Sequence, residues 1–318
     1  MPWLIGIDEA GYGPNLGPLV QAAVPIRVRD EAGDLWQVLA EHVRRAGGRD
    51  DGRLLIDDSK KVNAGAYGFS RLERGTLTAL AGHLKLPTTL GELLKRTAIG
   101  DSRADLLREA WFDVTLGLPS DGNCDPLHQS AKMLSQALEK QRLLLGAVRT
   151  VVTPTPRFNS LLTKWGNKAV VLGAGVIALL RECRQMPGDE PITFLIDKLG
   201  GRHYYAAVIQ EAFPDGWCQA EREGPEICSY RILGADRVIR LVIQPRADGT
   251  HLTVALASML AKYLRQLFMR QFNAYWLTHV PGLAPTAGYP GDAGRYFASI
   301  RPKVLELGFT DDAIWRRK

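Results

Sequence analysis

The chain has 318 residues, of which 46% are hydrophobic and 23% charged, and its formal net charge is +6. This length and composition are ordinary for a globular protein of one large or two modest domains, and the basic excess favours a polyanionic partner such as nucleic acid. No apolar run approaches the ~20 residues needed to span a bilayer and the start of the chain lacks the basic leader of a secretion signal, so we expect a cytoplasmic protein without a membrane partner.

The first part of the chain predicts two strands and a helix. Residues 3–7 form a short apolar run that ends at two acids and a glycine cluster, which is typical of a buried strand. Residues 20–28 predict a second strand, antiparallel to the first if the GYGPNLGP stretch between them is a turn. Residues 34–45 have the apolar spacing of a helix.

The segment 92–147 differs in kind from its surroundings. Its helical patterns, separated by a turn-rich stretch, lie at residues 93–95, 104–110 and 130–145. We therefore interpret 92–147 as a helical insertion of unknown role within an α/β domain that comprises residues 1–91 and 148–318.

The last part of the chain predicts further strands and the clearest amphipathic helix. Residues 192–196 predict a strand that ends at Asp197, and residues 231–245 contain one strand or two joined at 234–236. Residues 253–272 predict the amphipathic helix. This order of elements indicates an α/β fold with a mixed central sheet flanked by helices.

Four acids stand where the predicted strands end or just before the long helix. Asp8 and Glu9 end the first strand, Asp197 ends a later one, and Asp248 precedes the helix. Acids at the ends of adjacent strands converge on one edge of a sheet. Because neighbouring strand residues point to opposite faces, Asp8 and Glu9 need a local kink if both are to reach one site. Taken alone, each acid is more often a turn or cap residue.

Grouped carboxylates predict a particular chemistry. Hard oxygen ligands suit Mg²⁺ or Mn²⁺, and two such ions ~3.5–4 Å apart can stabilise both the entering and the leaving oxygen when a phosphodiester is hydrolysed. Without metal, the acids would repel one another and hold raised pKa values. The cysteines form no CxxC pair, so we expect free thiols and no zinc site.

Several sequence blocks, in the right order, resemble the type 2 ribonuclease H family. They are Gly6–Val20 (GIDEAGYGPNLGPLV), Asp57–Val62 (DDSKKV), Leu195–Asp197, Ala257–Lys262 (ASMLAK), Gly288–Pro290 and the closing Arg316–Lys318. The resemblance implies a divergent member with a ribonuclease H-like α/β fold and insertions at 92–147 and 199–245. It implies an endoribonuclease that hydrolyses the RNA strand of RNA–DNA hybrids, with single ribonucleotides in duplex DNA as an open alternative substrate.

The resemblance also implies roles for individual residues. Asp8, Glu9, Asp197 and Asp248 would be catalytic and bind two Mg²⁺ or Mn²⁺ ions. The implied substrate-binding residues are Gly11, Tyr12, Gly13, Ser59, Lys60, Lys61, Asn159, Ser258, Lys262 and Tyr289. Among them Tyr289 matches a family tyrosine that stacks on the sugar at the RNA–DNA junction. A half-buried aromatic beside a turn proline is the alternative, and we favour the functional role because Gly288 and Pro290 match as well.

Two positions depart from the family pattern. Gly11-Tyr12-Gly13 stands where the family usually has Gly-Arg-Gly, and a tyrosine can stack on a sugar or base but cannot make a forked contact to phosphate. Lys198 stands where glycine is common, and it would contact phosphate or point to solvent. Two alternatives therefore stay open: a non-catalytic nucleic-acid-binding or scaffold protein on the same fold, and a related nuclease acting on structured DNA.

Overall fold

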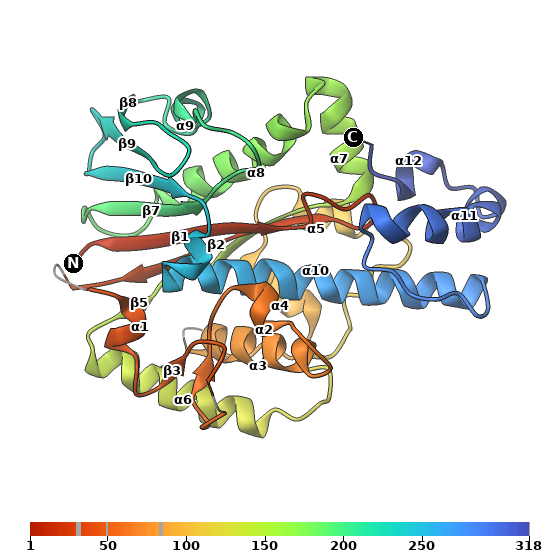
Figure 1. Ribbon diagram of the computed structural model, residues 1–318, viewed down its shortest axis with the longest axis horizontal. Coiled ribbons are helices and arrows are strands. Elements are labelled where there is room, and N and C mark those ends of the chain that lie inside the picture. Colours follow the sequence, from red (N-terminus) through yellow and green to blue (C-terminus); the bar gives the residue numbers. More distant parts are fainter. Residues whose placement is uncertain (30–32, 49, 83–84, 318) are drawn as a thin grey trace.

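A mixed eight-stranded sheet forms the centre of the computed structural model. The structure describes residues 1–29, 33–48, 50–82 and 85–317, so Lys318 of the closing basic run lies outside the described residues. The strand order is β5-β2-β1-β7-β10-β9-β8, and β6 also pairs with β2 (Figure 1). The strands are β1 (Trp3–Ala10), β2 (Leu19–Arg27), β5 (Leu144–Leu145), β6 (Arg149–Thr153), β7 (Ile192–Asp197), β8 (Trp217–Arg222), β9 (Cys228–Leu233) and β10 (Ile239–Gln244).

The pairing directions explain why β1 is central. It runs antiparallel to β2 and parallel to β7, and β7 in turn runs parallel to β10. Strands in the middle of such a sheet are covered on both faces, so β1 and β2 are almost continuously apolar. The predicted α/β fold with a mixed sheet is confirmed, as are the antiparallel second strand and the two strands joined around Gly234.

Helices cover both faces of the sheet. On one face lie α10 (Leu252–His279), α3 (Gly68–Ala81), α4 (Leu90–Thr97) and α6 (Asp125–Lys140), and on the other α7 (Thr155–Trp165), α8 (Lys168–Cys183) and α9 (Ala206–Ala212). The helices α11 (Pro290–Glu306) and α12 (Asp311–Ile314) lie together at one end of the molecule (Figure 1). Short elements are α1 (Leu35–Val38), α2 (Ser59–Val62), α5 (Ser102–Leu106), the 3-10 turn η1 (Ala247–Gly249), and β3 (Val43–Arg44) paired with β4 (Leu54–Leu55).

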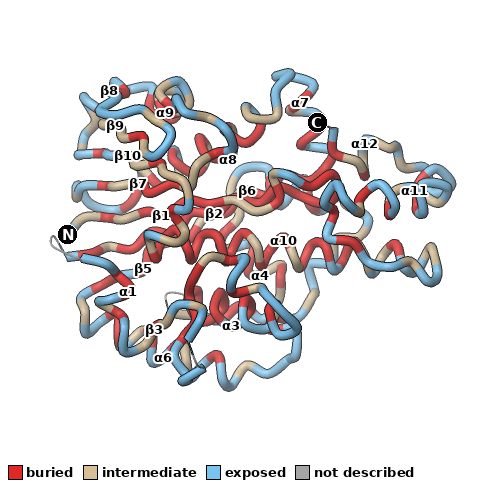
Figure 2. The backbone as a smooth tube through the Cα atoms, in the orientation of Figure 1, coloured by how far each residue is buried: buried red, intermediate tan, exposed pale blue. Residues whose placement is uncertain are grey.

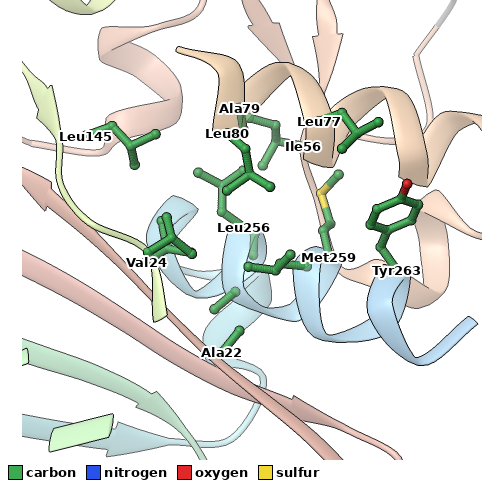
Figure 3. Packing of buried hydrophobic residues seen from close by; sticks show 14 of the residues in the cluster. Ala22, Val24, Ile56, Leu77, Ala79, Leu80, Leu145, Leu256, Met259 and Tyr263 are labelled. Carbon is green, nitrogen blue, oxygen red and sulfur yellow. The ribbon is translucent and has the colours of Figure 1, made fainter. Parts of the chain in front are cut away.

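The core has one large hydrophobic layer on each side of the sheet and a further cluster where the end of α10 packs against α11 and α12. Buried residues follow the central strands and α10, whereas the outer helices are buried on one side only (Figure 2). Figure 3 shows part of the layer on the α10 side of the sheet, where Val24 of β2 lies near Leu256 of α10 and Leu80 of α3. Burying an apolar side chain of this size contributes roughly 1.5–3 kcal/mol, so these layers fix the helices on the sheet.

The helix predicted at residues 34–45 is wrong beyond its first turn. Only α1 is helical, and the chain then turns into β3, which pairs with β4. The Trp36 indole donates a hydrogen bond to the carbonyl of Ile56 at 3.0 Å, and this contact ties the turn to β4. The apolar residues are buried as the spacing suggested, but a non-local strand pairing replaces the helix.

The helix predicted at residues 130–145 also ends early. It stops at Lys140, Arg142 takes a left-handed conformation with φ 52°, and Leu145 pairs with Ile26 as part of β5. The segment 92–147 therefore supplies an edge strand to the sheet. Its apolar side chains join the same hydrophobic layer as α10, and its role as an inserted domain stays a prediction.

The four cysteines are free thiols, as predicted, with Cys124 half-buried and the others buried. Within the described part of the chain, no helix combines the length and the apolar character that crossing a membrane requires.

Strand β1 touches the first turn of α10 through its backbone at Gly6. A methyl group placed on Gly6 would lie 2.1 Å from the carbonyl carbon of Thr253 and 2.3 Å from the nitrogen of Val254. Only glycine allows this approach, because both neighbouring atoms belong to the backbone and cannot move aside.

We predict that Gly6→Ala lowers the free energy of unfolding by about 3 kcal/mol, since strand and helix must separate to admit the methyl group. Urea denaturation followed by circular dichroism measures this. Gly294→Ala is the matched control: Gly294 is exposed within α11 with no atom within 4 Å of the added group, so the change should be neutral or slightly stabilising. Equal stability of the Gly6→Ala variant and the wild type would contradict the prediction.

Candidate functional site: a carboxylate cluster at the strand ends

Asp8 and Asp197 lie side by side where β1 and β7 end. Each is the next residue after the last pair of the parallel β1–β7 ladder. Adjacent strands lie ~4.8 Å apart, and side chains alternate between the two faces. Gly6 and Leu195, two residues earlier, face α10, so both carboxyls lie on the α10 face of the sheet.

Glu9 joins this pair without the expected kink. The antiparallel register of β1 with β2 continues unbroken to Ala10, and the chain bends only afterwards, at Gly11 with φ +93°. Glu9 lies beyond the end of the β1–β7 ladder, so no strand neighbours it on that side. Its carboxyl interacts electrostatically with Asp197 and Asp248 despite the alternation.

Asp248 is brought to the cluster by η1. The backbone nitrogen of Ala247 donates a hydrogen bond to Oδ1 of Asp197 at 2.8 Å, and Arg246 starts the turn in a left-handed conformation with φ 58°. Asp197 thus acts both as a member of the cluster and as the anchor of the turn that carries Asp248. The structure therefore brings together all four acids predicted from the sequence.

Burial raises the pKa of every acid in the cluster, and repulsion between carboxyls adds to it for Asp8, Glu9 and Asp248. Burial, followed by repulsion from Glu9 and Asp197, raises the pKa of Asp8 well above its ordinary value. Burial and Asp197 raise the pKa of Glu9 to about 7. Burial, Asp58 and Asp197 raise the pKa of Asp248 to about 6, and burial raises that of Asp197. The fold holds negative charges together that water would keep apart.

The chemistry of the donor set fits a divalent cation. Every donor is a carboxylate oxygen, and Oε2 of Glu9 is buried without a hydrogen-bond partner among the described residues. In the same described ranges, no three acidic, histidine or cysteine side chains are grouped tightly enough to hold a metal ion as they stand. The four acids are therefore neighbours that do not surround a common point as metal ligands would, and Oε2 of Glu9 is the oxygen left without a partner in the described part of the chain.

Helix α2 supplies the polar side chains next to the acids. The Ser258 hydroxyl, on α10, forms hydrogen bonds with the Ser59 hydroxyl at 3.0 Å and with the Asp8 carboxyl. Lys60 interacts electrostatically with Glu9, Asp197 and Asp248 and lowers their pKa values. Its charge therefore partly offsets the repulsion among the acids.

Lys61 and Lys198 point elsewhere. Lys61 forms an ion pair with Asp57 at 3.3 Å. The Lys198 amine donates to the carbonyl of Pro225 at 3.0 Å and lies 3.2 Å from Nδ1 of His203. Lys198 thus joins its own loop to the segment between β8 and β9.

Two buried arginines hold the loop that follows the acids. Arg316, 1% exposed, donates hydrogen bonds to the carbonyls of Gly11 and Tyr12, and Arg265, 2% exposed, donates to that of Leu16. No ion pair among the described residues includes either arginine. Burial, together with repulsion from Arg265, lowers the pKa of Arg316 to about 9. Buried unpaired charge is costly, so the arginines serve the shape of this loop more than overall stability.

The Gly288–Pro290 turn is part of the same assembly. The carbonyl of Gly288 accepts hydrogen bonds from the backbone nitrogens of Asn15 and Leu16. Gly288 has φ +81°, and an added methyl group would lie 2.4 Å from the Leu16 carbonyl oxygen. Tyr289 is 44% exposed, and the Lys262 amine lies 6.0 Å from the centre of its ring. The structure thus places the Tyr289 ring, partly open to solvent, beside the loop.

Asn159 and Gly13 do not join the acids directly. The Asn159 amide donates to the carbonyls of Asp312 and Trp315, and its oxygen accepts from the backbone nitrogen of Arg317. Asn159 therefore fixes the segment that carries Arg316. Gly13 is exposed, and a Cβ added to it would have no atom within 4 Å.

Sequence reasoning missed three residues of this site. Asp58, which interacts with Asp248, stood in a motif already singled out but was not assigned a role. Arg316 stood in the closing basic run, and its burial gave no sequence signal. Arg265 looked like part of the polar face of an amphipathic helix, because its partners are backbone carbonyls that leave no pattern.

We predict that Glu9→Gln makes the metal-free protein more stable at pH 8. A carboxyl whose pKa rises from 4.5 to about 7 on folding opposes folding when ionised, by about 3 kcal/mol. This cost is absent below pH 4.5, grows up to pH 7 and is then constant. Thermal unfolding in EDTA should show a gain of roughly 2–6 °C at pH 8 and almost none at pH 4.5. A less stable variant at pH 8 would refute the electrostatic interpretation.

Several solved structures are similar to the structure of this chain. The chain is similar to ribonuclease H2 from Pyrococcus horikoshii OT3 (12% identity, 98% of this chain and 92% of that chain, TM-score 0.49). It is also similar to RNase HII of Archaeoglobus fulgidus, solved with PCNA (11%, 99% and 94%, 0.42), and to Bst-RNase HIII, solved with Mn²⁺ (16%, 99% and 66%, 0.39). No family model and no curated protein matches the sequence. Sequence identity to these structures is 11–16% and each TM-score lies below 0.5.

Proposed function

We propose that the protein is a divalent-metal-dependent endoribonuclease that hydrolyses the RNA strand of RNA–DNA hybrids. The observation that carries the proposal is the meeting of Asp8, Glu9, Asp197 and Asp248 at one edge of the sheet, with pKa values raised by burial and repulsion. A cluster of acids this costly to ionise has a clear use as a cation site.

Mg²⁺ or Mn²⁺ held by these four carboxylates would supply neutralising charge at the scissile phosphate and a water molecule of lowered pKa. The raised pKa values mean that cation binding and carboxyl ionisation favour each other. Ser258 orients the Asp8 carboxyl through its hydrogen bond. Lys60 stays close to three of the acids and reduces their repulsion.

The surrounding loop accounts for selection of RNA. The 2′-hydroxyl distinguishes RNA from DNA, and a sugar can be recognised by stacking on an aromatic ring. Tyr289, exposed beside the loop of Gly11 and held next to Lys262, suits such a contact. The exposed backbone of Gly13 can approach a nucleotide closely, because glycine has no side chain in the way.

We predict that Asp8→Asn and Asp197→Asn each reduce cleavage of an RNA–DNA hybrid by at least about 100-fold, since loss of a partner outside the ligand shell already costs 10–100-fold. The cleavage rate of a labelled hybrid in Mg²⁺ or Mn²⁺ measures this loss. EDTA should abolish cleavage by the wild type, and the products should carry 3′-hydroxyl and 5′-phosphate ends. Asp236→Asn, an exposed acid in the β9–β10 turn, is the matched control.

Other outcomes would support the alternatives. Metal-independent hybrid binding with a steep salt dependence and no cleavage would identify a non-catalytic binding or scaffold protein. Equal cleavage of structured DNA would identify a nuclease of different specificity. Duplexes with one, four or many ribonucleotides determine whether single ribonucleotides or longer RNA tracts are preferred.

We predict that Ser258→Ala raises the concentration of Mn²⁺ needed for half-maximal cleavage by about 10-fold, because the Asp8 carboxyl loses its orienting hydrogen bond. Titration of the cleavage rate with Mn²⁺ measures this, and Ser258→Thr, which retains the hydroxyl, should recover part of the loss. An unchanged metal requirement in Ser258→Ala would show that this hydrogen bond does not orient a ligand.

A further inference from the structure

The ring of Tyr12 lies where three distant segments meet. The Lys168 amine, at the start of α8, lies 4.6 Å from the ring centre. A Cβ placed on Gly200 would lie 3.3 Å from Cε1 of the same ring. Tyr12 is therefore bordered by α8 and by the loop that follows Asp197, and it is neither an isolated surface aromatic nor a core residue.

The loop after Asp197 is firmly held. Tyr205 is 1% exposed and donates two hydrogen bonds. Its backbone nitrogen donates to the Tyr230 hydroxyl at 2.9 Å, and its own hydroxyl donates to the carbonyl of Arg202 at 2.9 Å. At the other end, Lys198 is tied to the Pro225 carbonyl. This loop thus presents Arg202 in a defined place.

Arg202 is positioned to act together with Lys168. Its charge interacts with the Tyr12 hydroxyl, as does the charge of Glu9, and Arg202 stands two residues after Gly200, which borders the Tyr12 ring. No ion pair among the described residues includes Arg202, and its side chain is partly exposed. Arg316, the third cation near Tyr12, donates hydrogen bonds to the backbone carbonyls of Gly11 and Tyr12.

Aromatic and basic residues continue along the surface from this point. Trp165, 37% exposed at the end of α7, lies three residues before Lys168, which begins α8, and the Lys164 amine is 5.6 Å from the centre of a Trp165 ring. Alternation of cations with exposed rings suits a nucleic-acid strand, because the cations neutralise phosphates while the rings stack on sugars or bases.

We propose that Lys168 and Arg202 together form a phosphate clamp beside Tyr12, which binds the sugar–phosphate backbone of the nucleic acid next to the carboxylate cluster. This inference rests on the proposed function, because it names the part of the substrate held beside that site. Lys168 and Arg202 are positioning residues: they hold the strand in register and take no part in the chemical step.

The test uses the full chain and a labelled RNA–DNA hybrid. Lys168→Gln and Arg202→Gln should each raise KM by about three- to tenfold with kcat within twofold of wild type, because each removes one phosphate contact. Each should also lower the slope of log Kd against log salt by about one. Lys168→Arg and Arg202→Lys should retain most of the affinity, and melting temperatures check that each variant folds.

The matched controls are Lys132→Gln in α6 and Arg103→Gln in α5, exposed cations elsewhere on the surface. An unchanged KM and salt slope in the Lys168 and Arg202 variants, or an equal change in the controls, overturns the clamp. Binding is measured separately in the Asp8→Asn background. Wild-type protein that fails to cleave would therefore defeat the proposed function, while the salt slopes would still decide the clamp.

Discussion

The close approach of β1 and α10 at Gly6 is the constraint on which the site depends. A side chain at this position would collide with the backbone of Thr253 and Val254. Because strand and helix lie this close, Ser258, about one and a half turns further along α10, reaches the carboxyl of Asp8. The same contact sets the surface on which α2 and η1 gather around the ends of β1 and β7.

Charges of opposite sign are buried close together here without being paired with one another. The acids meet at the strand ends, whereas Arg265 and Arg316 lie behind the following loop and bind its carbonyls. Direct ion pairs would satisfy both groups and leave no carboxylate oxygen such as Oε2 of Glu9 available to a ligand. The loop therefore separates a cationic support from an anionic site, and this separation keeps the acids reactive.

Local patterns in the sequence predicted those strands and helices whose burial follows a regular period. Apolar runs and their terminal acids located the central strands, and helical periodicity located α10, because burial on a sheet or beneath a helix imposes those periods. The helix expected at 34–45 failed because β3 and β4 pair across a gap in sequence. Arg265 and Arg316 were missed for the same reason: they bind backbone carbonyls of distant segments, which leave no motif.

The hydrogen bond from Arg316 to the carbonyl of Gly11 joins residues 305 positions apart in the chain. Closing so long a loop carries an entropic cost that local elements do not share, and contacts of such high sequence separation form slowly. The carboxylate cluster can assemble from β1, β7 and η1, but its neighbouring loop takes shape only once the two ends of the fold have docked. A partly folded chain whose ends have not docked would thus hold the acids without the contacts that shape the loop beside them.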